Sequence, residues 1–445
     1  LLRPKLVFLD HTFPVDNYDA LMPDQLIVNL DIETSISSFY FSFSDFLANA
    51  SRISPEVIMY EIERNATNPD PLIFLQTSGS TSEPKILPFT NRAIFATMLY
   101  FSNSTGTKTR DETVDGVLCI MPYQHGYGWM TIFINLMGGN RVILAPGLTP
   151  EHIGRYHELK PSYLYGSPII LRHFLEQTPE SADLSFLVKV FVAGFSISED
   201  FYQSIRAFLC AHNATSAEIC NSYGISEALC VGTAADGLTH RPGTCGKFHH
   251  GPGLTFRIVD ENLDEVADGE VGELMISSES LCCGYLGDEP STAKAFIEQD
   301  GKTFFLTGDY FRSREDGFVS CVGRKNRFFQ PSNSGDKVNC ETIEQALSRC
   351  ELVEQCVVVP VEHRGILDSA CAFIVLTDEA RGDENSWSAV GDYQDAHLPS
   401  HQRASALCVI GEIPLMSSGK PDYAQLEQLY REFTAIDDLY EDCDT

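Results

Sequence analysis

Short apolar runs recur along the first half of the chain and are separated by longer segments of mixed polarity. The runs are LIFLQ (72–76), VLCIMP (117–122), RVILAP (141–146), SYLYG (162–166) and VKVFVAG (188–194). Segments between them, such as EHIGRYHEL and EDFYQSIRAFL, have helical patterns. Strands that alternate with helices are typical of α/β layering, so the pattern predicts a mainly parallel sheet covered by helices.

The pattern changes near residue 254. From there TFRIVDEN, GEVGELMIS, FFLTGDYF and GFVSCVG read as paired strands with Asp/Gly turns between them. We therefore predict a β-rich subdomain from about residue 254, within a large domain that spans residues 1–324.

A polar stretch, KNRFFQPSNSGDKVN, follows Arg324 and has the Pro, Gly, Ser and Asn content of a domain boundary. Beyond it, ETIEQAL and DYAQLEQLYREF read as helices, and VEQCVVVPVE, ACAFIVL and ALCVIGE read as strands. Residues 325–445 are thus predicted to form a small α+β C-terminal domain.

Composition limits the classes of partner. The 445 residues are 43% hydrophobic, which is ample for two structural units, and the formal net charge is −31. This charge argues against a nucleic acid or an anionic membrane surface as partner, because both bind basic patches. No apolar run approaches the ~20 residues of a membrane span and no signal-peptide pattern follows Leu1, so we expect a cytoplasmic protein. The 14 cysteines include no C-x-x-C pair, so reduced thiols are expected.

The segment TSGSTSEPK, Thr77–Lys85, has the hydroxyls, glycine and lysine of a phosphate-binding loop. The P-loop pattern G-x-x-x-x-G-K-S/T does not fit it, because Pro84 stands where the second glycine is required and Ile86 where the hydroxyl should follow. A P-loop kinase or NTPase is therefore a poor interpretation. Taken alone, the segment could equally be a Ser/Thr-rich turn.

Four further segments follow in a fixed order: NSYGISE (221–227), FLTGDY (305–310), GRKNRFF (323–329) and PLMSSGKPDYAQL (414–426). They supply, in turn, an aromatic residue with a glutamate, an aspartate on a tight turn, an arginine before the predicted boundary, and a lysine on a Gly-containing turn before a helix. Together with TSGSTSEPK, this set in this order resembles the acyl-adenylate-forming (AMP-binding) enzymes, which are acyl-CoA synthetases, adenylation domains of peptide synthetases and luciferases. The nearest type is a stand-alone aryl or acyl acid ligase.

The resemblance covers about residues 70–426. It implies a small, mobile C-terminal domain, ATP-dependent activation of a carboxylic acid to an acyl adenylate, and ATP and Mg²⁺ as cofactors. The family loop that handles the β- and γ-phosphates and pyrophosphate matches Thr77, Ser78, Gly79, Ser80, Thr81 and Lys85, with Thr81 also a metal-binding candidate. Further nucleotide-binding positions implied by the match are Gly194, Phe195, Ser196, Asn221, Ser222 and Gly224.

Three roles follow by match to the segment NSYGISE. Tyr223 resembles the aromatic residue that stacks on adenine. Ser226 stands near the α-phosphate, where the family usually has threonine. Glu227 resembles the magnesium-binding glutamate. Core packing for Tyr223 and turn or capping roles for Glu227, and also for Asp309 of FLTGDY, are the structural alternatives.

Three more roles come from the later segments. Asp309 resembles the acceptor of the ribose hydroxyls, and Arg324 resembles a second ribose or phosphate contact. Lys420 resembles the lysine that bridges the acyl carboxylate and the α-phosphate; a solvated loop lysine would look the same.

The chemistry fits these roles. A carboxylate that attacks the α-phosphate brings two anions together, so donors are needed where negative charge develops. Lys420 can supply that charge, and its loss should cost about 10²–10³ in rate. Because Mg²⁺ keeps several waters, one carboxylate, Glu227, plus substrate phosphates is sufficient.

The segment MPYQHGYGWM (121–130) resembles the family stretch P-x-x-H-x-x-G beside the acyl pocket. Amino-acid-activating members usually carry an aspartate nearby to pair with the substrate ammonium, and this chain has His125-Gly126 instead. An aryl or fatty acid is therefore favoured over an α-amino acid, and the bulk of Phe195 favours a compact, aromatic acid. The predicted pocket residues are His125, Gly126, Trp129, Ala193, Gly194 and Gly246.

In the second half-reaction of the family, a thiol displaces AMP after the small domain rotates about a hinge, which Asn326 occupies here. CoA and the phosphopantetheine of a carrier protein both remain open as the thiol.

Ser82 and Ile86 replace glycines that are usual in the phosphate loop. Three alternatives therefore stand: an amino-acid adenylation domain, an adenylation-only or luciferase-like enzyme, and a non-catalytic adenylate-binding sensor or scaffold.

Overall fold

The computed structural model describes residues 6–9, 26–29, 40–42, 69–77, 85–105, 116–121, 126–144, 150–193, 197, 199–234, 241–331, 337–363, 366–382, 385–415 and 421–441. The chain divides into two compact units, Leu1–Pro69 and Asp70–Thr445. The first unit contains a three-stranded parallel sheet in the order β1-β2-β3. Its strands are β1 (Leu6–Leu9), β2 (Leu26–Asn29) and β3 (Tyr40–Ser42).

A seven-stranded sheet forms the centre of the second unit, in the order β12-β11-β10-β9-β8-β6-β7. Five neighbouring strands are parallel, and β11 and β12 extend the sheet antiparallel. The strands are β6 (Gly116–Cys119), β7 (Arg141–Leu144), β8 (Tyr163–Gly166), β9 (Lys189–Val192), β10 (Glu218–Gly224), β11 (Gly232–Ala234) and β12 (Lys247–Phe248).

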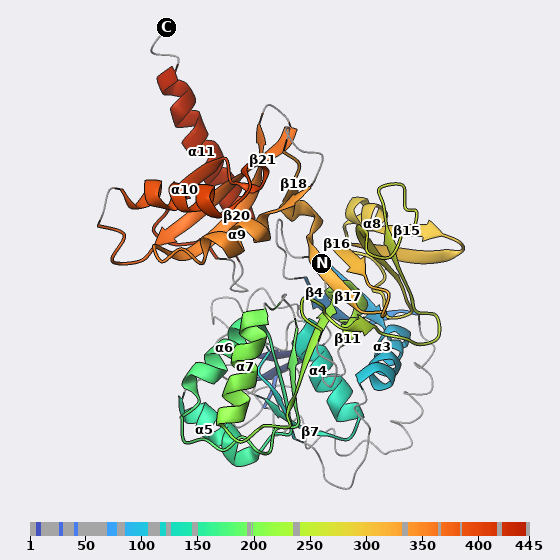
Figure 1. The fold of residues 1–445 in the computed structure, drawn as a ribbon. Coiled ribbons are helices and arrows are strands. Elements are labelled where there is room, and N and C mark those ends of the chain that lie inside the picture. Colours follow the sequence, from blue (N-terminus) through green and yellow to red (C-terminus); the bar gives the residue numbers. More distant parts are fainter. Residues whose placement is uncertain are drawn as a thin grey trace, which may run out of the picture. The chain divides into compact units, whose positions relative to one another are not determined.

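Helices cover both faces of the parallel strands, which is why β6 is apolar and buried along its whole length. One face carries a core shared with α5, α6 and α7, and the other carries aromatic residues packed with Tyr127 of α4 (Figure 1). The helix α6 begins where Ser167 caps the amide of Ile170 and Pro168 takes the first helical position. The helices are α4 (Gly126–Met137), α5 (Pro150–Leu159), α6 (Pro168–Gln177) and α7 (Glu199–Ala211).

The run LIFLQ forms a strand, but it is not a member of the parallel sheet. It lies in β4 (Pro71–Gln76), which pairs antiparallel with β5 (Ile86–Thr90) in a separate hairpin before α3 (Asn91–Thr105). The interpretation of this run as part of the parallel layer is therefore wrong. Only a short loop separates β4 from β5, and a short loop joins antiparallel strands, whereas parallel strands need a longer crossover.

The predicted β-rich region is an antiparallel sheet in the order β13-β14-β16-β15, with β17 paired to β16. Helix α8 (Glu289–Ala295) precedes β15. The strands are β13 (Thr255–Val259), β14 (Val271–Ser277), β15 (Phe296–Gln299), β16 (Lys302–Ser313) and β17 (Val319–Arg324).

The last part of the chain contains a second α+β arrangement. The pair β18 (Phe328–Phe329) and β19 (Val338–Asn339) is antiparallel, and a three-stranded sheet has the order β20-β21-β22. The other elements are β20 (Val353–His363), β21 (Ile366–Leu376), β22 (Ala406–Val409), α9 (Cys340–Leu347), α10 (Ser386–His397), the 3-10 turn η4 (Ser400–Gln402) and α11 (Tyr423–Glu441). None of the helices in the described ranges has both the length and the apolar composition needed to cross a membrane. The domain boundary after Arg324 stays a prediction.

A buried arginine connects these C-terminal elements. Arg327 lies in the 3-10 turn η3 (Lys325–Arg327) and is only 4% exposed. Its guanidinium donates to Glu344 of α9 at 2.5 Å and to the carbonyl oxygen of Val358 in β20 at 2.6 Å, and it lies 4.5 Å from the ring centre of Tyr423 in α11. The backbone amide of Val358 also donates to Glu344, at 2.7 Å. One cation thus binds two helices and a strand to the turn that precedes them.

We expect Arg327→Met to lower the free energy of unfolding by about 3–5 kcal/mol, because Glu344, whose side chain is only 20% exposed, would lose its charged partner. Urea-induced unfolding measures the change. The matched control is Arg381→Met, which removes exposed ion pairs with Glu354 (2.9 Å) and Asp378 (3.2 Å) and a hydrogen bond to the carbonyl oxygen of Leu376, and should cost only about 1 kcal/mol. Equal losses in the two variants would contradict a special contribution from Arg327.

Candidate functional site

The hairpin of β4 and β5 carries the predicted phosphate loop at its tip. The amide of Thr77 donates to the carbonyl oxygen of Lys85 at 2.9 Å, and the amide of Lys85 donates to Oγ1 of Thr77 at 3.0 Å. This reciprocal pair closes the loop at its base. The predicted loop residues Ser78, Gly79, Ser80 and Thr81 lie outside the described residues.

Strand β10 leads into a tight turn that presents Ser226 and Glu227. A Cβ atom on Gly224 would lie 2.3 Å from the carbonyl oxygen of Cys230, so only glycine fits at this position. The 3-10 turn η2 (Ser226–Ala228) follows, and then Leu229 and Cys230 adopt left-handed conformations with φ of 48° and 64°. Such conformations are uncommon for non-glycine residues and often occur where a turn presents functional side chains.

Two predicted nucleoside-binding residues, Tyr223 and Arg324, contact the buried carboxylate of a third, Asp309. Asp309 is 2% exposed and lies opposite Arg324 in the β16–β17 pair. The hydroxyl of Tyr223 donates to Oδ2 of Asp309 at 2.5 Å, and Nε of Arg324 lies 2.9 Å from Oδ1. Burial, and then the charge of Asp309, raise the pKa of Tyr223 well above its usual value, so its hydroxyl stays a donor. The Arg324 side chain is 55% exposed and can also contact a ligand.

A bulge in β16 presents Asp309. The register between β14 and β16 shifts between Glu273 and Met275, and Gly308 takes a left-handed conformation with φ of 69°. Glu273 accepts from the amide of Gly308 at 3.0 Å and pairs with Lys325 at 2.7 Å. The sequence analysis missed Glu273, although a lone acid within the apolar run GELMIS was a usable signal.

Glu227 has the properties of a ligand for a hard cation. Burial raises the pKa of its carboxyl group, and a hydrogen bond from the hydroxyl of Tyr285 to Oε1, at 3.1 Å, acts in the opposite direction. A single carboxylate of this kind suits Mg²⁺, which is usually bound by one or two carboxylates together with substrate phosphates. The part of the chain that the structure describes contains no cluster of three or more candidate metal ligands.

Tyr285 was missed by the sequence analysis and links two predicted site residues. Its ring lies 4.2 Å from Nζ of Lys85, while its hydroxyl reaches Glu227. Nζ of Lys85 also lies 3.8 Å from Asp288. A tyrosine in the segment CCGYLGDEP has no periodic pattern around it, so the sequence offered no clear signal of this role.

The predicted acyl pocket begins beside the turn of Ser226. Gly126, the first residue of α4, is buried, and a Cβ atom there would lie 3.8 Å from both Cα and Oγ of Ser226. Trp129 of the same helix stacks on Phe133 with ring centres 4.7 Å apart. The structure therefore brings Gly126 to the predicted nucleotide site, while Trp129 contributes to packing.

Other predicted residues hold neighbouring backbone segments together. The side chain of Asn221 donates to the carbonyl oxygen of Thr244 at 2.9 Å. The hydroxyl of Ser222 donates to the carbonyl oxygen of Val192 at 3.5 Å. Ala193 is 7% exposed, and its amide donates to the carbonyl oxygen of Gly166. The carbonyl oxygen of Gly246 accepts from the amide of Val319, which fixes this segment against β17.

Five further predicted residues lie outside the described residues: His125, Gly194, Phe195, Ser196 and Lys420. The ends of the segment that contains Lys420 are placed, however. Leu415 and Pro421 form an isolated antiparallel bridge, and the amide of Asp422 donates to the carbonyl oxygen of Pro414 at 2.8 Å. The segment that contains Lys420 is thus closed at its base, directly before α11.

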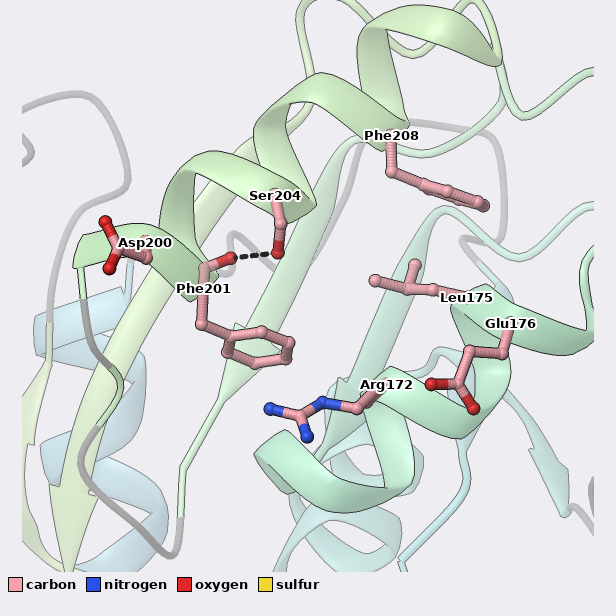
Figure 2. A pocket seen from close by; sticks show the side chains of 7 residues that line it. All are labelled: Arg172, Leu175, Glu176, Asp200, Phe201, Ser204 and Phe208. Carbon is pink, nitrogen blue, oxygen red and sulfur yellow. Dashed lines mark hydrogen bonds between the residues drawn. The ribbon is translucent and has the colours of Figure 1, made fainter. Parts of the chain in front are cut away.

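A cavity of about 530 Å³ lies between α6 and α7 and does not involve the site. Figure 2 shows the guanidinium of Arg172 near the ring of Phe201, at 5.3 Å, in a largely apolar groove. No predicted site residue lines this groove. Predicted site residues lie instead at the end of β10, as Tyr223 does, and in the β-rich sheet, as Asp309 does.

A buried histidine supports the strand that carries Tyr223. His249 is 3% exposed, and its Nδ1 accepts from the amide of Gly232, which lies opposite Gly224 in the β10–β11 pair. Within the described ranges Nε2 has no hydrogen-bond partner. Burial, with a smaller effect of His250, lowers the pKa of His249 to about 4.

We expect this histidine to make the folded protein less stable in acid. An unfolded histidine takes up a proton near pH 6.5, whereas folded His249 does so only near pH 4. Stability is therefore fully present above about pH 6.5 and falls by up to about 3 kcal/mol towards pH 4. His249→Gln should flatten the dependence of unfolding free energy on pH, measured by urea unfolding, and the control His250→Gln should keep most of it. A wild-type slope in His249→Gln would be evidence against this assignment.

Comparisons with known proteins agree with the predicted class. The family model described as AMP-binding enzyme matches residues 3–286, and the model described as AMP-binding enzyme C-terminal domain matches residues 342–420. The chain is 27% identical over 366 residues to Zwittermicin A synthase ZmaJ of Bacillus cereus, covering 80% of this chain and 67% of that protein. It is 23% identical to a D-alanine–D-alanyl carrier protein ligase of Streptococcus pneumoniae, covering 92% and 81%.

The fold is also shared with solved structures. The crystal structure of the anthranilate CoA ligase AuaEII in complex with anthranoyl-AMP aligns with a TM-score of 0.75 and 19% identity, covering 97% of this chain and 79% of that chain. This likeness confirms the predicted fold class. Other relatives are much longer, and the chain spans only 10% of surfactin synthase subunit 2 and 6% of tyrocidine synthase 3.

Proposed function

Because the chain belongs to the AMP-binding enzyme family, we propose that it activates a carboxylic acid with ATP, releases pyrophosphate, and passes the acyl group from the adenylate to a thiol. The observation that carries this proposal is the meeting of Tyr223, Asp309 and Arg324 at one buried carboxylate, next to the turn that presents Ser226 and Glu227. Tyr223 lies 86 residues before Asp309 in the sequence, and Arg324 lies opposite Asp309 on the neighbouring strand β17. A packing role alone would not require a buried acid with one exposed cationic partner.

The nucleoside end of ATP is assigned to Asp309 and its partners. Asp309 would accept from the ribose hydroxyls while Tyr223 and Arg324 hold its orientation, and the ring of Tyr223 would lie against adenine. A carboxylate already held by two donors loses little conformational freedom when a ligand binds. The Arg324 guanidinium, with more than half of its side chain exposed, remains available for a phosphate or ribose oxygen.

The phosphate end is assigned to the loop Thr77–Lys85 and to Glu227. Magnesium, when bound, would neutralise charge on the phosphate oxygens and hold them in a fixed geometry. Glu227 fits this ion because its carboxylate is desolvated and already oriented by one hydrogen bond. Ser226 and Gly126 lie together where the α-phosphate and the acyl carboxylate would meet, and Lys420 would supply positive charge to both.

The acid is proposed to be a compact aryl or short acyl acid. The segment MPYQHGYGWM lacks the aspartate that would pair with an α-ammonium group, and aromatic residues border it: Tyr127 is surrounded by Tyr165 and Phe191. The similar structure that holds anthranoyl-AMP supports an aryl acid. A D-alanine–D-alanyl carrier protein ligase among the relatives favours a second candidate, an amino acid.

The thiol is proposed to be CoA or a carrier-protein phosphopantetheine. One relative's name specifies a carrier protein and one similar structure is a CoA ligase, so both acceptors belong in the same test. A cytoplasmic location and the boundary after Arg324, with its hinge at Asn326, complete the proposal.

ATP–pyrophosphate exchange across a panel of aryl, fatty and amino acids tests the acid. We expect compact aryl acids to support the fastest exchange, because the predicted pocket is aromatic and has no carboxylate. Thioester formation with CoA and with a holo-carrier protein then identifies the thiol. Fastest exchange with an α-amino acid would favour the second candidate, and exchange that needs no acid would favour a nucleotide sensor.

Lys420→Ala should lower the rate of adenylate formation by about 10²–10³ while ATP binding changes little, because the lysine acts on charge that develops in the transition state. Single-turnover adenylate formation and calorimetric ATP binding measure the two effects separately. The control Lys302→Ala removes an exposed lysine that donates to Thr255. The role of Lys420 is wrong if rate and ATP binding fall together, or if neither falls.

A further inference from the structure

Tyr285 lies between the two groups that the proposed function assigns to the phosphate loop and to magnesium. Its ring centre is 4.2 Å from Nζ of Lys85, and its hydroxyl donates to Oε1 of Glu227 at 3.1 Å. The ring face attracts the ammonium group, and the hydroxyl holds one carboxylate oxygen. One side chain therefore contacts both groups.

Backbone hydrogen bonds attach the segment around Tyr285 to the same two elements. The amide of Cys282 donates to the carbonyl oxygen of Glu227 at 2.8 Å, and the amide of Leu286 donates to that of Ile86 at 2.9 Å. The segment is thus fixed to the turn of Glu227 at one end and to β5, beside Lys85, at the other. Tyr285 cannot shift without moving both.

Two neighbouring residues also contact the tyrosine. Its amide donates to Oγ1 of Thr292 at 2.9 Å, and Phe296 packs edge-on against its ring with centres 5.9 Å apart. Asp288, which caps α8, lies 3.8 Å from Nζ of Lys85. Lys85 is therefore held by a ring and a carboxylate from one short stretch of chain.

We propose that Tyr285 is a positioning residue that couples the metal-binding carboxylate Glu227 to the phosphate-loop lysine Lys85. The proposal rests on the proposed function and extends it. The hydroxyl orients the carboxylate towards the metal position, and the ring keeps the ammonium group at the base of the loop. Magnesium and the terminal phosphates would then be bound by two groups whose separation is set by a single rigid side chain.

The two contacts can be separated by substitution. Tyr285→Phe keeps the ring and loses the hydroxyl, so the Mg²⁺ concentration for half-maximal binding of a non-hydrolysable ATP analogue should rise about 10- to 100-fold. Tyr285→Leu also loses the ring, and binding of the analogue at saturating Mg²⁺ should weaken by a further factor of about 2 to 30. Isothermal titration calorimetry over a range of Mg²⁺ concentrations measures both quantities without turnover.

Phe296→Leu is the matched control, because it disturbs the packing of Tyr285 and leaves both polar contacts in place. It should keep the wild-type Mg²⁺ requirement, even if its thermal stability falls. In a Glu227→Gln background, Tyr285→Phe should have no further effect on the Mg²⁺ requirement, because the carboxylate that would bind the metal is gone.

The outcomes separate this proposal from the proposed function. A wild-type Mg²⁺ requirement in Tyr285→Phe, or an equal shift in Phe296→Leu, would overturn the coupling role while acid-dependent exchange by the wild type still stands. Lack of nucleotide binding and of acid-dependent exchange in the wild type would overturn both.

Discussion

The proposed site depends on one carboxylate that is almost completely buried. Asp309 is 2% exposed, and burying a carboxylate is costly unless its oxygens are paired. Tyr223 and Arg324 satisfy one oxygen each, and they come from the end of the parallel sheet and from a neighbouring strand of the β-rich sheet. The same interaction therefore joins the two sheets and forms the proposed ribose-binding position. Loss of either partner would affect the fold and the site together.

Much of the surrounding structure maintains this arrangement. The left-handed Gly308 and the hydrogen bond from its amide to Glu273 form the bulge that presents Asp309. Gly224, next to Tyr223, allows the close approach of the Cys230 backbone. On the other side of the turn, Tyr285 connects Glu227 to Lys85. The proposed nucleoside and phosphate positions thus lie at separate but adjoining hydrogen-bonded groups.

The sequence predicted the elements more reliably than their pairing. The run LIFLQ was correctly predicted as a strand, but its apolar pattern does not encode its partner, and it pairs in a hairpin. Motif order predicted Tyr223, Asp309 and Arg324, which the structure brings together. Tyr285 and Glu273 could not be found in this way, because their roles arise from contacts with distant residues and not from local spacing. Lys420 and most of the phosphate loop stay predictions, supported by the closed bases of their turns.

The proposed activation step is the attack of an acid's carboxylate on the α-phosphorus of ATP. The most direct measurement uses an accepted acid labelled with ¹⁸O in its carboxyl group, with mass spectrometry of the AMP formed after transfer to the thiol. We expect one ¹⁸O atom in the phosphate of AMP, because the acid oxygen that formed the bond to phosphorus stays on phosphorus when the thiol takes the acyl group. Unlabelled AMP, or label only in pyrophosphate or free phosphate, would contradict it.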